Sequence, residues 1–343
     1  MPRLSLLCAV LLLSGCALLG DGRPRPGAIV ETATGRSVGE AGLMAAARGA
    51  DFVLLGEKHD NPAHHALQAR VVSGLAGASP PLEAVVFEMM TTDQQAAIVG
   101  YLKDRPGDAG GLGPALDWKL SGWPDWALYR PIAAAALEGG AEIVAGNLTG
   151  AEVKGALRDG LGALPAGLVH RTGLDTPLQP RLQADLLDEL VEAHCGYLKA
   201  DQLGGMALVQ RARDARMADR MATLAGRGRA VLIAGAGHVR LDRGVPIYLA
   251  RLAPGRRILS IGFVEAGEEG LDRDPSTLPY DYAWLTPSSD PEGFDACAAF
   301  RGELERIRHR PPPARAQTAG LDREGAPPAG GREAYPASIS EGR

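Results

Sequence analysis

The sequence predicts an α/β fold with a mostly parallel central sheet flanked by helices, and two observations support this prediction. Short apolar runs that suit buried strands alternate along the chain with longer stretches of helical spacing. This alternation is typical of units in which a helix connects two parallel strands. The second observation is that four of the apolar runs end in glycine, acidic, amide or imidazole residues. Ligand sites of open parallel sheets lie at that edge of the sheet.

The first predicted strand begins at Phe52, and the first predicted helix spans residues 62–75. The run from Phe52 to Leu55 is too short for a helix, and Pro62 suits a first helical turn, where its missing N–H group is not needed. Further strands are predicted at 84–87, 141–145, 230–234 and 257–264, with an edge strand at 282–285. Further helices are predicted at 92–102, 125–137, 151–157 and 245–252, and loops at 105–124 and 165–180.

Two longer stretches of helical spacing, 182–194 and 206–224, predict a helical insertion over about residues 180–226. Gln210 and Arg213 interrupt the methionine-rich stripe of the second stretch. Two interpretations remain open: a partly exposed helix whose arginine stems cover apolar surface, or a helix that lines a pocket. The predicted folded domain covers 29–300. Residues 301–343, rich in proline, alanine and glycine, are predicted to form a disordered tail.

The amino-terminal residues 1–15 are typical of a signal peptide, because the apolar run from Leu4 to Leu13 is too short to span a bilayer. The run ends in Leu13-Ser14-Gly15-Cys16, which resembles the bacterial lipobox and implies lipidation of Cys16. Residues 16–28 are then a linker. Several acyl chains anchor a protein durably, and Ala17 is not the aspartate that retains lipoproteins at the inner membrane. We therefore expect a bacterial cell-envelope protein, lipid-anchored at the outer membrane and facing the periplasm.

The net charge and the cysteine content indicate which binding partners and which cellular compartment to expect. The net charge is −5 and no basic stripe is present, so nucleic acid is not an expected partner. Cys8 leaves with the signal peptide and Cys16 carries lipid, which leaves Cys195 and Cys297. Two remaining cysteines often pair in an oxidising periplasm, so we predict a disulfide between them. Two separate buried thiols are the alternative.

Residues 56–65, between the first strand and the first helix, hold the densest group of polar side chains. Three of the seven histidines, His59, His64 and His65, lie here beside Glu57. The start of a helix disfavours protonated imidazole and so favours a neutral, ligating ring. The spacing matches neither the His-Glu-x-x-His helix motif nor a cysteine-based zinc site, so it specifies no metal.

The other predicted strands end in Glu88, Asn147 and His238, and a parallel sheet would bring these residues to the same edge as Glu57. This convergence is the strongest indication of a site. Gly235-x-Gly237 lacks the third glycine of a dinucleotide fingerprint, so we do not predict nucleotide binding.

Several motifs of the chain occur together in one known family. They are residues 56–65 (Gly-Glu-Lys-His-Asp-Asn-Pro-Ala-His-His), Phe87-Glu88-Met89, Trp123-Pro-Asp-Trp126-Ala-Leu-Tyr129-Arg-Pro131, Gly146-Asn147-Leu148, His194-Cys195-Gly196, Gln210-Arg-Ala-Arg213-Asp214 and Gly235-Ala-Gly-His238. This set resembles the ChaN-like lipoproteins, a haem-binding branch of the Tiki and erythromycin-esterase superfamily, over roughly residues 29–300. The resemblance implies iron or haem uptake and a homodimer that holds two haems face to face, with a tyrosine as iron ligand and a histidine nearby.

Within this resemblance, Tyr129 is the first choice for the iron ligand and Tyr197 the second. The alternative for Tyr129 is a packed aromatic residue with a hydrogen-bonded hydroxyl. His64 is expected near the iron. Other residues expected to contact haem are His59, His65, Arg213 and His238, and the propionates could pair with Arg213 and Arg216.

Two further functions compete with haem binding. The wider superfamily implies a hydrolase that depends on a divalent metal ion, in which Glu57, His59 and His238 hold the metal and its water and Glu88 is the general base. The third interpretation is an interaction lipoprotein with an inactive site. The fuller set of family motifs, the lipid anchor and the methionines that suit an apolar slot favour haem over an enzyme.

Overall fold

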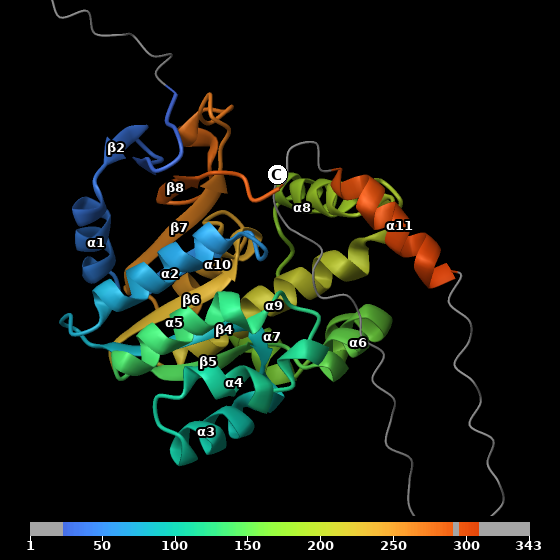
Figure 1. Cartoon of the computed structure of the whole chain (residues 1–343). Helices are drawn as coiled ribbons and strands as arrows, with labels where there is room; N and C mark the ends of the chain where they lie inside the picture. Colours follow the sequence, from blue (N-terminus) through green and yellow to red (C-terminus); the bar gives the residue numbers. More distant parts are fainter. Residues whose placement is uncertain (1–22, 291–294, 309–343) are drawn as a thin grey trace, which may run out of the picture.

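The computed structural model describes residues 23–290 and 295–308. Within them, one eight-stranded sheet has the order β2-β1-β8-β7-β3-β6-β4-β5 (Figure 1). The strands are β1 (Ile29–Glu31), β2 (Arg36–Val38), β3 (Phe52–Glu57), β4 (Leu82–Thr91), β5 (Glu142–Asn147), β6 (Arg229–Gly235), β7 (Ile258–Glu265) and β8 (Tyr282–Thr286). All neighbours from β8 to β5 pair in parallel, and the β1–β2 hairpin is antiparallel. The predicted mostly parallel α/β sheet is confirmed.

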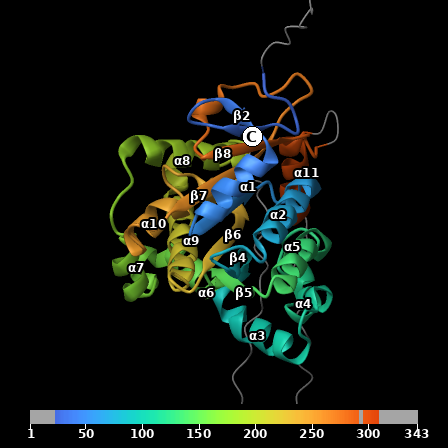
Figure 2. The ribbon, with the colours of Figure 1, turned by 90° about the vertical axis from the view of Figure 1, so that its left-hand side faces the viewer.

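Side chains of the central strands alternate between two hydrophobic cores, one on each face of the sheet. Val53 and Leu55 belong to the first core, whereas Phe52 and Leu54 belong to the second. Figure 2 shows the helices divided between these two faces. On the first face lie α1 (Glu40–Gly49), α2 (Pro62–Leu75), α3 (Gln95–Asp104), α4 (Ala109–Ala115) and α5 (Trp126–Glu138); on the second lie α6 (Gly150–Asp159), α7 (Ala166–Thr172), α9 (Gly204–Ala222) and α10 (Val245–Leu252).

Local capping explains why α2 and α5 begin where the sequence predicts. The Asn61 side chain accepts a hydrogen bond from the Ala63 N–H group at 2.9 Å, and Pro62 occupies the first turn. Asp125 accepts from the Ala127 N–H group in the same way, at 2.8 Å. The start of α2 fixes the direction in which the following histidines point.

Two predicted loops contain helices. Within 105–124 lies α4, where Asp108 accepts from the Gly111 N–H group at 2.9 Å and Leu112 is buried. Gly113 lets the Trp126 ring approach, since a side chain there would overlap it. The glycines and the proline within α4 lower its intrinsic helix propensity. Packing against α5 outweighs this unfavourable propensity. Within 165–180 lies α7, which is too short for its spacing to be detected.

The predicted edge strand at 282–285 is an internal strand, so this prediction is wrong. β8 pairs with β7 on one side and with β1 on the other. The β1–β2 hairpin, which forms the actual edge, was not predicted because each of its strands has 3 residues. Such short strands carry no clear alternation of polar and apolar residues.

The predicted helical insertion consists of α8 (Pro180–Ala193) and α9, and α9 packs directly on the second face of the sheet. Residues 301–308 belong to α11 (Ala296–Arg308) and are not the disordered segment predicted for them. The predicted disulfide between Cys195 and Cys297 is confirmed, and it joins α11 to the segment after α8.

The predicted signal peptide, lipidated Cys16 and residues 309–343 lie outside the described residues. Among the helices that are described, none has the length and apolar character needed to cross a membrane.

Candidate functional site

Polar side chains from three neighbouring parallel strands meet at the carboxyl edge of the sheet. Glu57 ends β3, Glu88 lies near the end of β4, and His238 follows β6. The predicted convergence is therefore confirmed. Together with side chains from α2, α5 and α9, these residues form what we call the carboxylate–imidazole network: Glu57, His59, His65, Glu88, Tyr129, Asp214 and His238.

Glu57 is the centre of one half of the network. Its Oε1 atom accepts hydrogen bonds from His59 Nδ1 at 2.8 Å and from the Tyr129 hydroxyl at 3.0 Å. Its Oε2 atom lies 3.2 Å from His65 Nδ1. The carboxylate is fully buried. Burial alone would raise the pKa of Glu57, but the charge of His65 and the hydrogen bond from His59 outweigh it and lower the pKa.

Glu88 is the centre of the other half. Its Oε2 atom accepts from the Gly235 N–H group at 2.8 Å, and its Oε1 atom lies 3.3 Å from His238 Nε2. His238 Nδ1 in turn donates to Asp214 at 2.6 Å. Burial acts to raise the pKa of Glu88, but the charge and hydrogen bond of His238 hold it well below its usual value.

His59 connects the two halves, because its Nε2 atom lies 3.8 Å from Glu88 while its Nδ1 atom contacts Glu57. Its ring also packs against Trp123, with centroids 4.8 Å apart. Asn147 has a supporting role: its side-chain amide donates to the backbone carbonyl of Glu88 at 2.9 Å. The result is a chain of acids and imidazoles in which protons can be held or shared.

Tyr129 is completely buried, and its hydroxyl donates to Glu57. Burial, reinforced by the negative charge of Glu57, raises the pKa of Tyr129 well above its ordinary value. A haem ligand needs an accessible oxygen that can lose its proton. The geometry therefore agrees with the alternative interpretation of Tyr129, a packed aromatic residue with a bonded hydroxyl, and does not favour it as the first-choice iron ligand.

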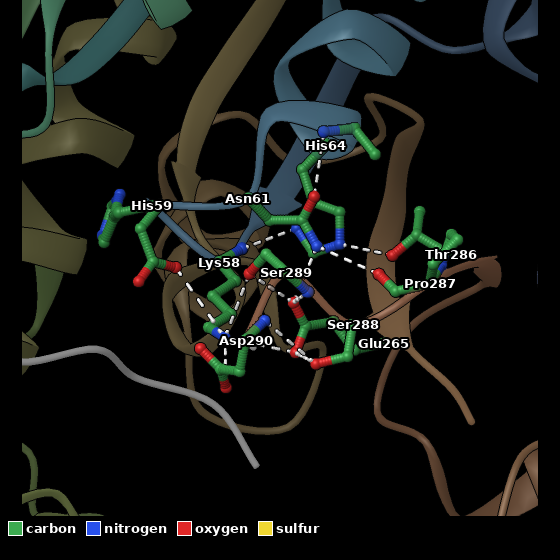
Figure 3. Close-up of polar contacts among 12 residues, drawn as sticks. Lys58, His59, Asn61, His64, Glu265, Thr286, Pro287, Ser288, Ser289 and Asp290 are labelled. Atoms are coloured by element: carbon green, nitrogen blue, oxygen red, sulfur yellow. Dashed lines mark hydrogen bonds and ion pairs between the residues drawn. The ribbon is translucent and has the colours of Figure 1, made fainter. Parts of the chain in front are cut away.

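Lys58 and His64 lie on the opposite side of the corner between β3 and α2. Figure 3 shows them among polar residues from the ends of β7 and β8, with His59 pointing away. We call this group the Lys58 cluster: Lys58, Asn61, His64, Glu265, Thr286, Ser289 and Asp290. Lys58 Nζ lies 2.8 Å from Asp290 and 3.2 Å from Glu265. Asn61 donates to Glu265 at 2.7 Å.

Both ring nitrogens of His64 are engaged within this cluster. Nδ1 accepts from the Lys58 N–H group at 2.8 Å, and Nε2 lies 2.8 Å from the Thr286 hydroxyl. Burial lowers the pKa of His64 from 6.5 to about 4. The ring is thus neutral, as predicted, but burial is the main cause and no surface of the ring remains exposed. This environment does not favour the predicted place of His64 near a haem iron.

Three polar residues of the α8–α9 segment differ from the network, because each has an exposed side chain or an unpaired polar atom. Tyr197 follows α8 with 45% of its surface exposed, and its hydroxyl accepts from Arg301 at 2.8 Å. On α9, the buried Nε atom of Arg213 and the buried Oε1 atom of Gln210 have no hydrogen-bond partner among the described residues. The Nε atom of Arg216 also lacks a partner, but Arg216 differs in that its Nη2 atom pairs with Glu152 at 2.6 Å.

The sequence reasoning missed the role of Asp214. It lies on a buried stripe of α9, seven residues after Ala207 and four before Ala218. An acidic residue at that spacing in an apolar stripe is the signal that could have identified it, because buried carboxylates need partners. Among the described residues, no three His, Cys, Asp or Glu side chains are arranged to hold a metal ion, so the divalent-metal alternative gains no support.

The family model described as haem-binding uptake, Tiki superfamily, ChaN matches residues 43–249. A structure of ChaN of Campylobacter jejuni with cofacial haem binding is 20% identical, has a TM-score of 0.59, and covers 75% of this chain and 95% of that chain. The type III effector HopBA1 is 16% identical with a TM-score of 0.40, covering 72% and 92%.

An erythromycin esterase mutant, EreC in its open conformation, is 15% identical with a TM-score of 0.40, covering 78% of this chain and 82% of that chain. No curated protein matches the sequence. The fold agrees with that of the Campylobacter protein, and the family model matches more than half of the chain. The chain belongs to the ChaN family of haem-binding uptake proteins in the Tiki superfamily.

Proposed function

We propose that this protein binds haem as a cargo and carries it in iron uptake. Membership of a haem-binding family supports the ligand. The observation that assigns the haem contacts to particular residues comes from two side chains of the α8–α9 segment. Tyr197 presents an accessible phenol there, and the buried Nε atom of Arg213 has no hydrogen-bond partner among the described residues.

Tyr197 is the iron ligand in this proposal. Its hydroxyl lies at the surface, whereas that of Tyr129 is enclosed and donates to Glu57. The disulfide at Cys195 joins α11 to this segment, and α11 supplies Arg301, which donates to the Tyr197 oxygen. A donor of this kind supports a ligand oxygen in one orientation.

Arg213 is the proposed partner of a haem propionate. An arginine fork matches a carboxylate in geometry and charge, and burying its Nε atom without an acceptor costs free energy that a ligand can recover. Arg216, one turn further along α9, already pairs with Glu152 and Asp219. We therefore assign the propionate contact to Arg213 and not to Arg216.

His59 is the proposed histidine near the haem. It is the most exposed histidine of the group formed with His64, His65 and His238, and Trp123 packs against its ring. Glu57 and Glu88 hold the ring from both sides, so it cannot rotate freely. His65 and His238 then orient the carboxylates and do not touch the cargo.

The membrane anchor, the cellular compartment and the oligomeric state are also part of the proposal. We infer a lipid-anchored protein on the outer membrane, facing the periplasm, that pairs into a homodimer around two cofacial haems. The lipobox-like sequence at Cys16 supports the anchor, and the disulfide suits an oxidising compartment. The cofacial haem binding of the Campylobacter protein, which shares the fold, supports the dimer.

Ferric haem titration of the purified protein, followed by absorption and light scattering together, tests the proposal. We expect saturable binding, a spectrum typical of tyrosinate-ligated iron, and dimerisation on loading. Tyr197→Phe should weaken binding more than tenfold, and Arg213→Gln about tenfold, which is about 1.4 kcal/mol. Arg216→Gln is the matched control and should bind like the unmodified protein. Binding that never saturates in a folded sample would contradict haem as the cargo.

A further inference from the structure

A polar pocket lies between α7, α9 and α10. Figure 2 shows these helices together on the second face of the sheet. The pocket has a volume of about 260 Å³. Its lining combines two arginines and a tyrosine with an apolar wall: Arg211, Arg251, Tyr248, Thr176, Leu178 and Ile247.

Tyr248 provides the first indication that this pocket is a binding site. The residue lines the pocket and is 3% exposed, and its buried hydroxyl makes no hydrogen bond of good geometry among the described residues, although the charge of Arg211 acts on it. Buried polar groups in folded proteins nearly always have a partner, because leaving one unpaired costs about 1–3 kcal/mol. A buried hydroxyl without a good hydrogen bond, on a residue that lines a pocket, is therefore a group that a ligand could satisfy.

Arg211 and Arg251 provide the second indication. Arg211 donates through Nη2 to the carbonyls of Leu174 and Thr176 at 2.9 and 2.6 Å, while its buried Nε atom has no acceptor. Arg251 donates to the carbonyl of Arg171 at 3.2 Å. Neither guanidinium has a carboxylate within ion-pair distance in the described part of the chain. Two positive charges thus face one small pocket, and neither is ion-paired within the described residues.

The backbone beside the pocket is shaped to admit Arg251. Gly173 has a φ angle of +70°, which favours glycine, and a Cβ atom there would lie 3.0 Å from the Arg251 guanidinium. The turn after α7 therefore leaves room for the arginine. Arg211 bonds to carbonyls of the same turn and fixes it from the α9 side.

We propose that this pocket binds a small organic carboxylate. The carboxylate would lie between the Arg211 and Arg251 guanidinium groups, whose planar forks suit two-point contact with such an anion. The Tyr248 hydroxyl would donate to the same group. Leu178 and Ile247 would contact the apolar body of the ligand, which distinguishes an organic acid from inorganic phosphate. This site is separate from the haem residues and does not rest on the proposed function.

Calorimetric titration of the whole protein with benzoate tests the proposal, with neutral benzamide and inorganic phosphate as comparison ligands. We expect saturable benzoate binding and none with benzamide. Arg251→Gln should weaken benzoate binding about tenfold and Tyr248→Phe about threefold. Arg181→Gln changes an exposed arginine on α8, outside the pocket, and should leave binding unchanged.

Tyr248→Phe also has a readout that separates binding from folding. Because the hydroxyl makes no hydrogen bond of good geometry in the described structure, its removal should not lower the thermal unfolding midpoint, although it weakens benzoate binding. Absence of saturable benzoate binding in a folded sample would overturn the proposal, as would binding that is unchanged in Arg251→Gln. Tighter binding of phosphate than of benzoate would overturn the assignment to an organic acid.

Discussion

The two sides of the corner between β3 and α2 are built from neighbouring residues but have different properties. On one side, His59 and His65 contact the buried carboxylate Glu57 within the carboxylate–imidazole network. On the other, Lys58 and His64 contact groups from the ends of β7 and β8. The network joins ionisable groups inside the protein, whereas the Lys58 cluster includes Asp290, whose side chain is 37% exposed.

This difference shows that histidines close in sequence need not share one site. His64 and His65 are adjacent in the first turn of α2, yet they point to opposite sides of the corner. The His64 ring ties α2 to β8 and is neutral through burial. The His65 ring bonds to the carbonyl of His59 and approaches Glu57. We therefore expect the Lys58 cluster to affect stability without affecting cargo binding, whereas cargo binding depends on His59, the least buried histidine of the network.

The largest expected effect comes from removing the central carboxylate of the network. Glu57→Leu leaves the buried donors of His59 and Tyr129 without their acceptor and should lower the free energy of unfolding by about 3–5 kcal/mol. Urea unfolding followed by circular dichroism measures it. Asp60→Asn, at a side chain that is 54% exposed, is the control and should change stability by less than about 0.5 kcal/mol. A loss for Glu57→Leu no larger than the control's would refute the central position of Glu57.

The second-largest expected effect is a change of the unfolding free energy with pH, caused by protonation of His64. Its pKa is about 4 in the folded protein against an ordinary 6.5, so the unfolded chain binds the proton more readily between these values. Stability should fall as pH decreases through this window, by up to about 3 kcal/mol from this residue. Urea unfolding at several pH values, compared with His64→Asn, measures the contribution. The same pH dependence in the variant would show that other groups cause it.

A smaller effect is expected for Lys58→Met, which keeps the stem of the side chain and removes its charge. Glu265 and Asp290 then lose their common partner, and the free energy of unfolding should fall by about 1–2 kcal/mol. Haem affinity should remain unchanged, because the cluster lies on the side of the corner opposite His59. A large loss of haem affinity with normal stability would place Lys58 in the binding site. It would then be wrong that only the His59 side of the corner binds the cargo.

The smallest expected effect is that of Tyr129→Phe, which removes one of the hydrogen bonds to Glu57. We expect a loss of about 1 kcal/mol in unfolding free energy and haem affinity close to that of the unmodified protein. Haem titration in parallel with Tyr197→Phe makes the comparison. Strong loss of binding in Tyr129→Phe, with normal binding in Tyr197→Phe, would return the iron ligand to Tyr129.

Local patterns in the sequence determined much of the fold and the place of the site. The apolar run at Phe52, the cap at Asn61 and the proline after it predicted β3 and α2, because strand burial and helix capping depend on adjacent residues. The parallel arrangement then placed Glu57, Glu88 and His238 at one edge. The pairing of Cys195 with Cys297 followed from the count of remaining cysteines.

Only the tertiary structure decided how the side chains at that edge are used. Tyr129 reaches Glu57 across 72 residues of sequence, and whether its hydroxyl is enclosed depends on how α5 packs against α2. The partnership of Asp214 with His238, and the opposite directions of His64 and His65, likewise depend on packing between distant elements. Sequence periodicity reports which face of an element is apolar, but contacts between elements fix which polar groups are buried, paired or open to a ligand.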